Sequence, residues 1–81
     1  MTTIPKILEA VMSGKKDNNI PFSDLQRLLD YMKFAHRING SHFIYWRENV
    51  EEIINIRADG NMAKAYQIKQ VRNIIRKYGL D

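Results

Sequence analysis

The sequence predicts a two-layer α+β domain with the element order α-α-β-β-β-α. Apolar residues recur with a helical period up to residue 33, with a period of two over residues 34–57, and with a helical period again from residue 64. An Asn-Gly pair at 39–40 separates two strand-like runs, which is a strong signal for a hairpin. We therefore expect a three-stranded antiparallel sheet with helices on one face and the other face open.

Two helices are expected before the sheet. The first covers residues 3–13, with Pro5 in its first turn and Gly14 ending it. The second starts at Ser23, which forms a capping-box pattern with Gln26, and ends near residue 33. Each helix carries one apolar stripe, made of Ile4, Ile7, Leu8, Val11 and Met12 in the first and of Leu25, Leu28, Leu29 and Met32 in the second.

The first two strands are expected at 34–38 and 41–47, with Asn39-Gly40 in a type I′ turn between them and a second turn near 48–49. Ile53, Ile54 and Ile56 mark the third strand, which ends at about residue 57. Both faces of the second strand are apolar. Alternation groups His42 with Ile44 and Trp46, but it does not say which face packs on the helices. The face left open is suited to stacking bases or to docking a protein.

The last helix is expected over residues 64–78, with Gly79 ending it. Residues 1–56 hold seven basic and seven acidic residues, whereas residues 57–81 hold six basic and two acidic ones, so the net charge of +4 arises at the C-terminal end. This asymmetry favours a polyanionic partner, although a merely solvated helix face is about equally plausible. A basic ridge follows the helix at Lys69, Arg72 and Arg76.

Length and composition limit the class of protein. Eighty-one residues correspond to one domain, and we expect a single unit over 1–81, with residues 1–20 as an N-terminal helical extension and 21–81 as the core. There is no cysteine, no His/Asp/Glu cluster with metal-ligand spacing, and no glycine loop for a phosphate, so we expect no metal and no cofactor. No apolar run approaches the length of a membrane span, and we expect a soluble protein of the cytoplasm.

His42 is the candidate for proton-transfer chemistry. An imidazole suits general acid-base work near neutral pH, and His42 directly follows Gly40 and Ser41 at the tip of a hairpin. Glycine lets a ligand approach the backbone, and turn amides with the Ser41 hydroxyl can donate hydrogen bonds to a phosphate. A lone histidine in a strand is more often structural, and His36, which lacks such a setting, is assigned to that role.

The chain resembles the HicA toxin family over most of its length, from about residue 6 to residue 80. The resemblance is carried by Ser-Asp-Leu-Gln-Arg-Leu-Leu at 23–29, Gly-Ser-His-Phe-Ile-Tyr at 40–45, Tyr-Gln-Ile-Lys-Gln-Val-Arg at 66–72 and Ile-Arg-Lys-Tyr-Gly-Leu at 75–80. It implies a fold like the double-stranded-RNA-binding domain, messenger RNA cleavage by the histidine of the Gly-Ser-His motif (here His42), and inhibition by a HicB-like antitoxin. Many members carry a second histidine after the third strand, whereas this chain has Ile-Arg-Ala-Asp-Gly at 56–60.

The sequence and the resemblance together predict a metal-independent endoribonuclease with His42 as its one catalytic histidine. Arg37, Lys64 and Arg72 are the candidates to stabilise charge on the phosphate, and Lys69 and Arg76 are expected to hold the RNA backbone. Gly40 and Ser41 complete the expected substrate-binding set. Two alternatives stay open at this point: a non-catalytic RNA-binding module, and a protein-interaction domain that docks an acidic partner.

Overall fold

A computed structural model describes residues 2–81, and Met1, the first residue of the predicted 1–81 unit, lies outside the described residues. The elements are α1 (Ile4–Ser13), α2 (Phe22–Tyr31), β1 (Ala35–Asn39), β2 (His42–Arg47), β3 (Val50–Ile56) and α3 (Ala65–Tyr78). The strands form one antiparallel sheet in the order β1-β2-β3. The predicted α+β class and element order are confirmed.

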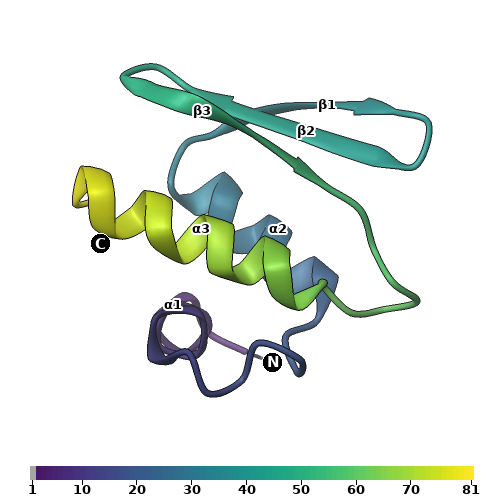
Figure 1. The fold of residues 1–81 in the computed structure, drawn as a ribbon, viewed down its shortest axis with the longest axis vertical. Coiled ribbons are helices and arrows are strands. Elements are labelled where there is room, and N and C mark those ends of the chain that lie inside the picture. Colours follow the sequence, from purple (N-terminus) through teal and green to yellow (C-terminus); the bar gives the residue numbers. More distant parts are fainter. Residues whose placement is uncertain (1) are drawn as a thin grey trace.

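The sheet forms one layer, α2 and α3 lie together beneath it, and α1 lies below these helices on the side away from the sheet (Figure 1). The core is built from the apolar stripes of the helices and from one face of the sheet. Its fully buried side chains include Leu25, Leu28, Leu29, Tyr45, Ile54, Ile56, Ile68 and Ile75. Because Ile7 and Val11 of α1 are also buried, the N-terminal segment contributes to the same core.

The start of α2 differs from the expected capping box at Ser23. The helix begins at Phe22, Pro21 occupies the N-cap, and no side chain caps it. The reason is a tertiary contact: the Phe22 N–H, which has no partner inside a helix, donates to the Asn61 carbonyl at 2.9 Å. A backbone partner from a distant loop therefore replaces the local serine cap.

The first hairpin is shifted by one residue from the prediction. Asn39 pairs with His42, so the two loop residues are Gly40 and Ser41 and the expected Asn39-Gly40 type I′ turn is wrong. Gly40 has φ +64°, whereas neither Asn39 nor Ser41 is among the described residues with positive φ. Glycine alone at positive φ in the first loop position is the pattern of a type II′ turn, which also matches the twist of paired strands.

The register decides which face of the sheet is open. Tyr45 pairs with Ile54, and both are fully buried against the helices. Because side chains alternate along a strand, His42, Ile44 and Trp46 lie on the opposite face, which no helix covers in Figure 1. The aromatic pair Phe43 and Tyr45 therefore belongs to the core.

Candidate functional site

His42 is the first residue of β2 and follows the two-residue loop directly, with an exposed side chain on the open face. Its Nδ1 lies 3.0 Å from Oδ1 of Asn55, which is a residue of β3. Since an amide oxygen only accepts hydrogen bonds, this contact requires the proton on Nδ1. In the neutral ring Nε2 is then unprotonated, and it is the nitrogen that can take a proton from a ligand.

The loop beside His42 is open to approach. Gly40 and Ser41 are both exposed, and a Cβ added at Gly40 would meet no atom within 4 Å. Glycine is needed here for the positive φ rather than to avoid a clash. The loop backbone and the Ser41 hydroxyl are thus accessible to a phosphate next to the imidazole.

Two arginines flank this site. Arg37 of β1 pairs with Ile44 of β2, and Asn39, two residues further along β1, pairs with His42. Arg37 is therefore a diagonal neighbour of His42 on the open face. Such neighbours lie roughly 7–8 Å apart, within the reach of long side chains. Arg57 is exposed and directly follows Ile56, the last residue of β3, which pairs with Phe43, the neighbour of His42 in β2.

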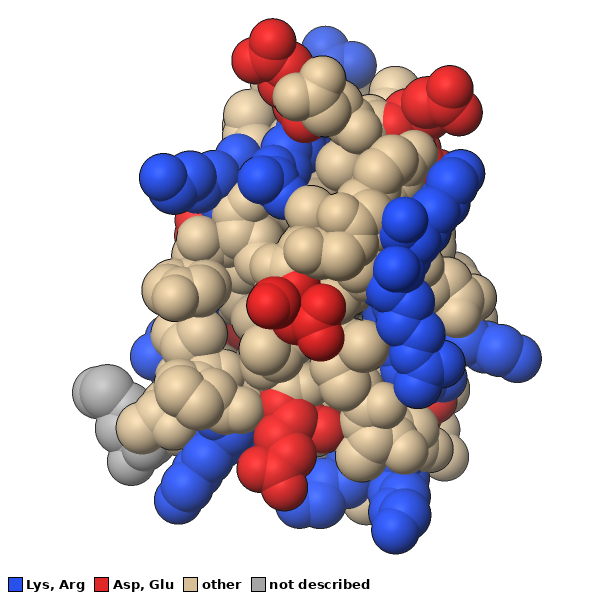
Figure 2. All heavy atoms as spheres, turned by 90° about the vertical axis from the view of Figure 1, so that its left-hand side faces the viewer, with Lys and Arg blue, Asp and Glu red and all other residues tan. Residues whose placement is uncertain are grey.

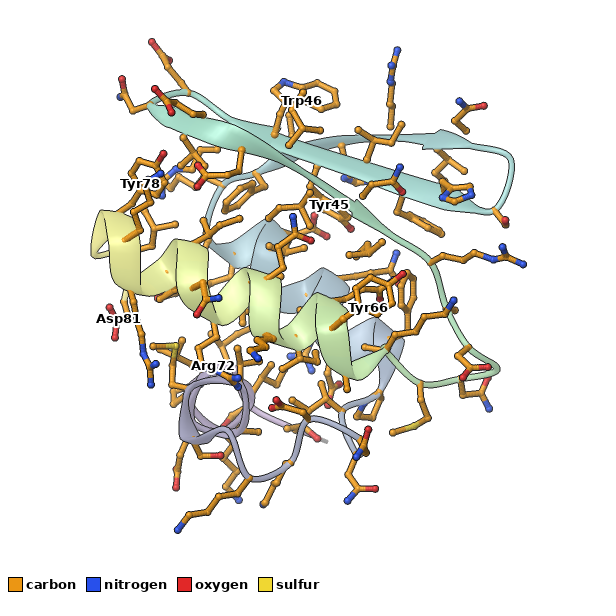
Figure 3. The ribbon with its side chains drawn as sticks, viewed as in Figure 1. Tyr45, Trp46, Tyr66, Arg72, Tyr78 and Asp81 are labelled. Atoms are coloured by element: carbon orange, nitrogen blue, oxygen red, sulfur yellow. The ribbon has the colours of Figure 1, made fainter. Side chains whose placement is uncertain are left out.

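Lys64 and Lys69 belong to another part of the molecule. Lys64 precedes α3, where its backbone N–H donates to Gln67 Oε1 at 3.3 Å, and Lys69 is exposed on α3. In Figure 3 Trp46 extends from the sheet away from the helices, whereas Tyr66, one turn from Lys69, extends from α3 beneath the sheet. The two lysines therefore lie on the helical side of the protein and not on the face that carries His42.

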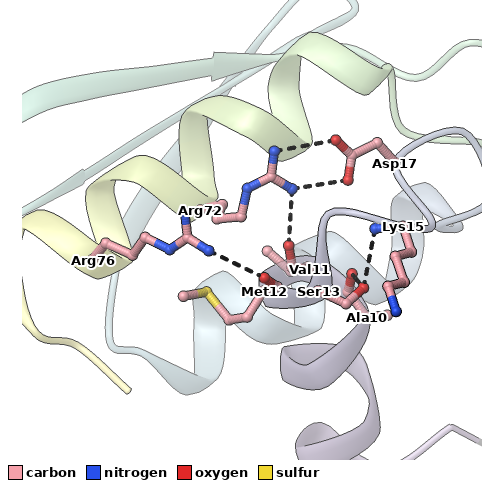
Figure 4. Close-up of polar contacts among 8 residues, drawn as sticks. All are labelled: Ala10, Val11, Met12, Ser13, Lys15, Asp17, Arg72 and Arg76. Atoms are coloured by element: carbon pink, nitrogen blue, oxygen red, sulfur yellow. Dashed lines mark hydrogen bonds and ion pairs between the residues drawn. The ribbon is translucent and has the colours of Figure 1, made fainter.

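Arg72 and Arg76 attach α3 to the end of α1 (Figure 4). Arg72 is only 8% exposed, and its guanidinium donates to both carboxylate oxygens of Asp17, at 2.9 and 3.2 Å, and to the Val11 carbonyl at 3.1 Å. Arg76 donates to the Met12 carbonyl at 3.4 Å. These carbonyls belong to the last turn of α1, where the backbone acceptors lack helical partners. Because these contacts occupy its guanidinium, Arg72 is not placed to contact a substrate. Two of the three residues of the expected RNA-binding ridge, Arg72 and Arg76, instead hold α3 against α1.

Ion pairs neutralise part of the positive charge of the C-terminal segment. Arg72 pairs with Asp17, and Lys77 pairs with Glu52 at 3.0 Å, so two basic residues of the last third meet carboxylates from the first two thirds. Figure 2, which views the left-hand side of Figure 1, shows basic and acidic side chains interspersed on that face. Among residues 2–81, Arg57, Lys64 and Lys69 are the basic residues of the last third that make neither an ion pair nor a side-chain hydrogen bond to the protein.

His36 lies on the other side of the sheet from His42. Its ring stacks on Tyr45 with centroids 4.9 Å apart, and its Nδ1 lies 3.5 Å from Asp30 Oδ1. Burial raises the pKa of the Tyr45 hydroxyl, and the Asp30 carboxylate adds to this effect. The position of His36 fits the packing role expected for it.

Sequence reasoning missed Asn55 and Arg57. Asn55 stands between two isoleucines in β3, and asparagine is depleted in strands, so a polar residue in this apolar run was the available signal. The sequence indicated Arg57 only as one of the six basic residues that give residues 57–81 their net positive charge. Neither could be assigned to His42 without the register of β2 against β3.

The comparisons with known proteins identify no relative. No family model, no curated protein and no solved structure matches the chain. Within residues 2–81, no helix combines the length and the apolar character required to cross a bilayer. The same residues contain no group of three or more histidine and acidic side chains arranged to hold a metal ion.

Proposed function

We propose that the protein is a metal-independent endoribonuclease that cleaves messenger RNA in the cytoplasm and acts as the toxin of a toxin–antitoxin module. The observation that carries the proposal is the exposed His42 imidazole, whose Nδ1 lies 3.0 Å from Asn55 Oδ1. This contact leaves Nε2 as the ring nitrogen that can accept a proton. The resemblance to HicA toxins in the Gly-Ser-His motif supports it. The same resemblance supports a HicB-like antitoxin as the partner, and a reading frame for such a protein beside the gene is the simplest check.

RNA brings its own nucleophile, the 2′ hydroxyl, so one proton acceptor is sufficient to start the reaction. Nε2 of His42 takes the 2′ proton, the 2′ oxygen forms a bond to the adjacent phosphorus, and the bond from phosphorus to the 5′ oxygen breaks. Water supplies the proton for the leaving 5′ oxygen, which leaves a 2′,3′-cyclic phosphate. General acid-base assistance of this kind accelerates a reaction by roughly 10²–10⁴.

The surroundings of His42 provide groups for the phosphate. The exposed loop amides and the Ser41 hydroxyl are hydrogen-bond donors, and Arg37 and Arg57 are the neighbouring cations. Cations and N–H donors near the non-bridging oxygens stabilise the charge that develops in the transition state. Lys64 and Lys69, on the helical side, are proposed to contact more distant parts of the RNA backbone without reading sequence.

The test is cleavage of a labelled RNA by purified wild type and His42→Ala. We expect the variant to lose roughly 10²–10⁴ in rate, because its proton acceptor is gone. Its thermal unfolding should match that of the wild type, since the His42 side chain is exposed. The wild type should cleave equally well in EDTA, and its products should end in a cyclic phosphate.

Asn55→Asp provides a sharper second variant. A carboxylate at this position favours the imidazolium form of His42, and the rising limb of the pH–rate profile should move to higher pH. Unchanged cleavage by His42→Ala, or loss of activity in EDTA, would contradict the proposed mechanism.

A non-catalytic RNA-binding module is the second candidate, and the open apolar sheet face with Trp46 favours it. Both functions require RNA affinity, so cleavage products separate them and binding does not. A domain that only docks an acidic protein would show no RNA affinity even at low salt.

A further inference from the structure

An apolar hollow lies on the open face of the sheet next to the His42 site. It measures about 270 Å³ and is lined by Arg37, Ile44, Trp46 and Ile53. Trp46 is 42% exposed and Ile53 is 63% exposed, although both lie in strands whose other faces pack in the core. In Figure 3 Trp46 points away from all three helices. Contiguous exposed apolar side chains on a solvent face are a feature of ligand-binding and partner-binding surfaces.

The hollow and His42 share one surface. Ile44 lies between His42 and Trp46 on the same face of β2, and four residues of strand span roughly 13 Å. Arg37 faces Ile44 across β1 and β2, so one cation borders both the histidine and the tryptophan. A single extended ligand can therefore pass from one to the other.

We propose that this hollow binds an unpaired nucleobase of an RNA strand, with the ring stacked on Trp46 and a neighbouring phosphate held by Arg37. An aromatic platform beside a cation is the chemistry by which proteins hold single-stranded nucleic acid. The charges agree with a polyanion, since alternation places only Glu51 among the carboxylates of β3 on this face, at the end remote from His42. The choice of RNA rests on the proposed function; the stacking site itself rests on Trp46.

The size of the hollow favours a base over a protein. A protein interface of standard size buries roughly 800 Å² on each partner and is organised around several buried anchors. One shallow hollow with four lining side chains suits a single planar ring. The strand must be unpaired, because a base inside a duplex has no free face to stack.

Trp46 is the single tryptophan of the chain, so its fluorescence reports on this site alone. The probe is a short 2′-O-methyl RNA strand, which binds but lacks the nucleophile needed for cleavage. We expect a saturable change of tryptophan fluorescence with this strand. An abasic strand of equal length keeps the phosphates and should produce little change, as should the same sequence in a duplex.

Variants measure the contribution of the ring through the anisotropy of a labelled strand. Trp46→Ala should weaken binding about 5- to 150-fold, the range expected when one stacked base is lost. Trp46→Phe should restore most of the affinity. Tyr31→Ala is the matched control, because Tyr31 is a 65% exposed aromatic residue of α2, in the helical layer, and its removal should leave affinity unchanged.

The proposal is overturned if the abasic strand binds as tightly as the intact one, or if Trp46→Ala keeps wild-type affinity. It is equally overturned if Trp46→Ala no longer binds an antitoxin protein while its affinity for RNA is unchanged, since the face is then a protein interface. Failure of the wild type to cleave ordinary RNA, with base-dependent binding intact, would refute the nuclease function and leave the stacking site standing.

Discussion

Two groups of basic side chains differ in how the protein uses them. On α3, Arg72 and Arg76 donate to the last turn of α1, and Arg72 also pairs with Asp17. On the open sheet face, Arg37 borders His42 and makes no ion pair within residues 2–81. From the sequence alone, α3 is the expected ligand surface, because Lys69, Arg72 and Arg76 follow one helix at close spacing.

The difference shows that a basic ridge identifies a ligand surface only when its charges are exposed. A guanidinium that is buried must be paired and hydrogen-bonded, and Arg72 satisfies this requirement inside the protein. Its donors are consequently unavailable to a phosphate. Arg37 has a solvated side chain next to an exposed histidine, which is the combination that a phosphate site needs.

The largest effect is expected on stability, from Arg72→Met. The substitution keeps the aliphatic stem but leaves the half-buried Asp17 carboxylate and the Val11 carbonyl without their partner. We expect a loss of about 2–4 kcal/mol in the free energy of unfolding. For a domain of this size the melting temperature should fall by about 10–20 °C.

Arg76→Met is the matched control for this experiment, since Arg76 is exposed and makes one 3.4 Å hydrogen bond. It should change stability by no more than about 0.5 kcal/mol. Circular dichroism during thermal and urea unfolding measures both variants. If Arg72→Met were as stable as the wild type, the contacts of Arg72 with Val11 and Asp17 would not stabilise the fold.

The reverse pattern is expected for RNA cleavage. Arg37→Ala should lower kcat/KM about 10- to 100-fold, because it removes a cation next to the phosphate bound at His42. It should leave the melting temperature unchanged, since Arg37 is exposed. Arg76→Ala should lower kcat/KM by less than a factor of about 3. Equal losses in the two variants would contradict the distinction between the two basic groups.

The smallest effect is expected at Glu52, in an ion pair that belongs to neither group. The Tyr78 hydroxyl donates to this carboxylate at 2.7 Å, and this bond, with the Lys77 contact, holds the pKa of Glu52 below its ordinary value of 4.5. The folded state thus has the lower pKa. The stabilisation is complete above pH 4.5 and is lost as the pH falls through the folded value.

Glu52→Gln should therefore be less stable than the wild type at neutral pH, and the difference should shrink in acid. Urea unfolding at a series of pH values from 7 to 3 measures this. If the difference in the free energy of unfolding between the two proteins stayed constant down to pH 3, the charge of the Glu52 carboxylate would contribute nothing to stability.

Much of the fold was predictable from local signals. The stripe of Leu25, Leu28 and Leu29 predicted α2, and the strand runs predicted the meander, because burial of one face imposes a period of 3.6 or 2 on the residues themselves. One error had a distant cause, since the Asn61 carbonyl moved the start of α2. The other was local: Asn39 pairs with His42, so the turn lies one residue further along the chain than predicted.

The candidate site divides in the same way. His42, Gly40 and Ser41 are adjacent in the chain, so the sequence alone brought them together. Asn55 meets His42 across 13 residues, and Asp17 meets Arg72 across 55. Such pairs depend on strand register and on helix packing, which no local pattern encodes.

By itself, the sequence determined the helices and strands, the location of the hairpin and the histidine at its tip, because periodicity and turn chemistry act between near neighbours. Only the tertiary structure decided that the face with His42 and Trp46 is open, and that Arg72 points into the protein. Both depend on which surfaces the helices cover, since packing the apolar stripes of α2 and α3 against Tyr45 and Ile54 buries one side of the sheet and leaves the other to solvent.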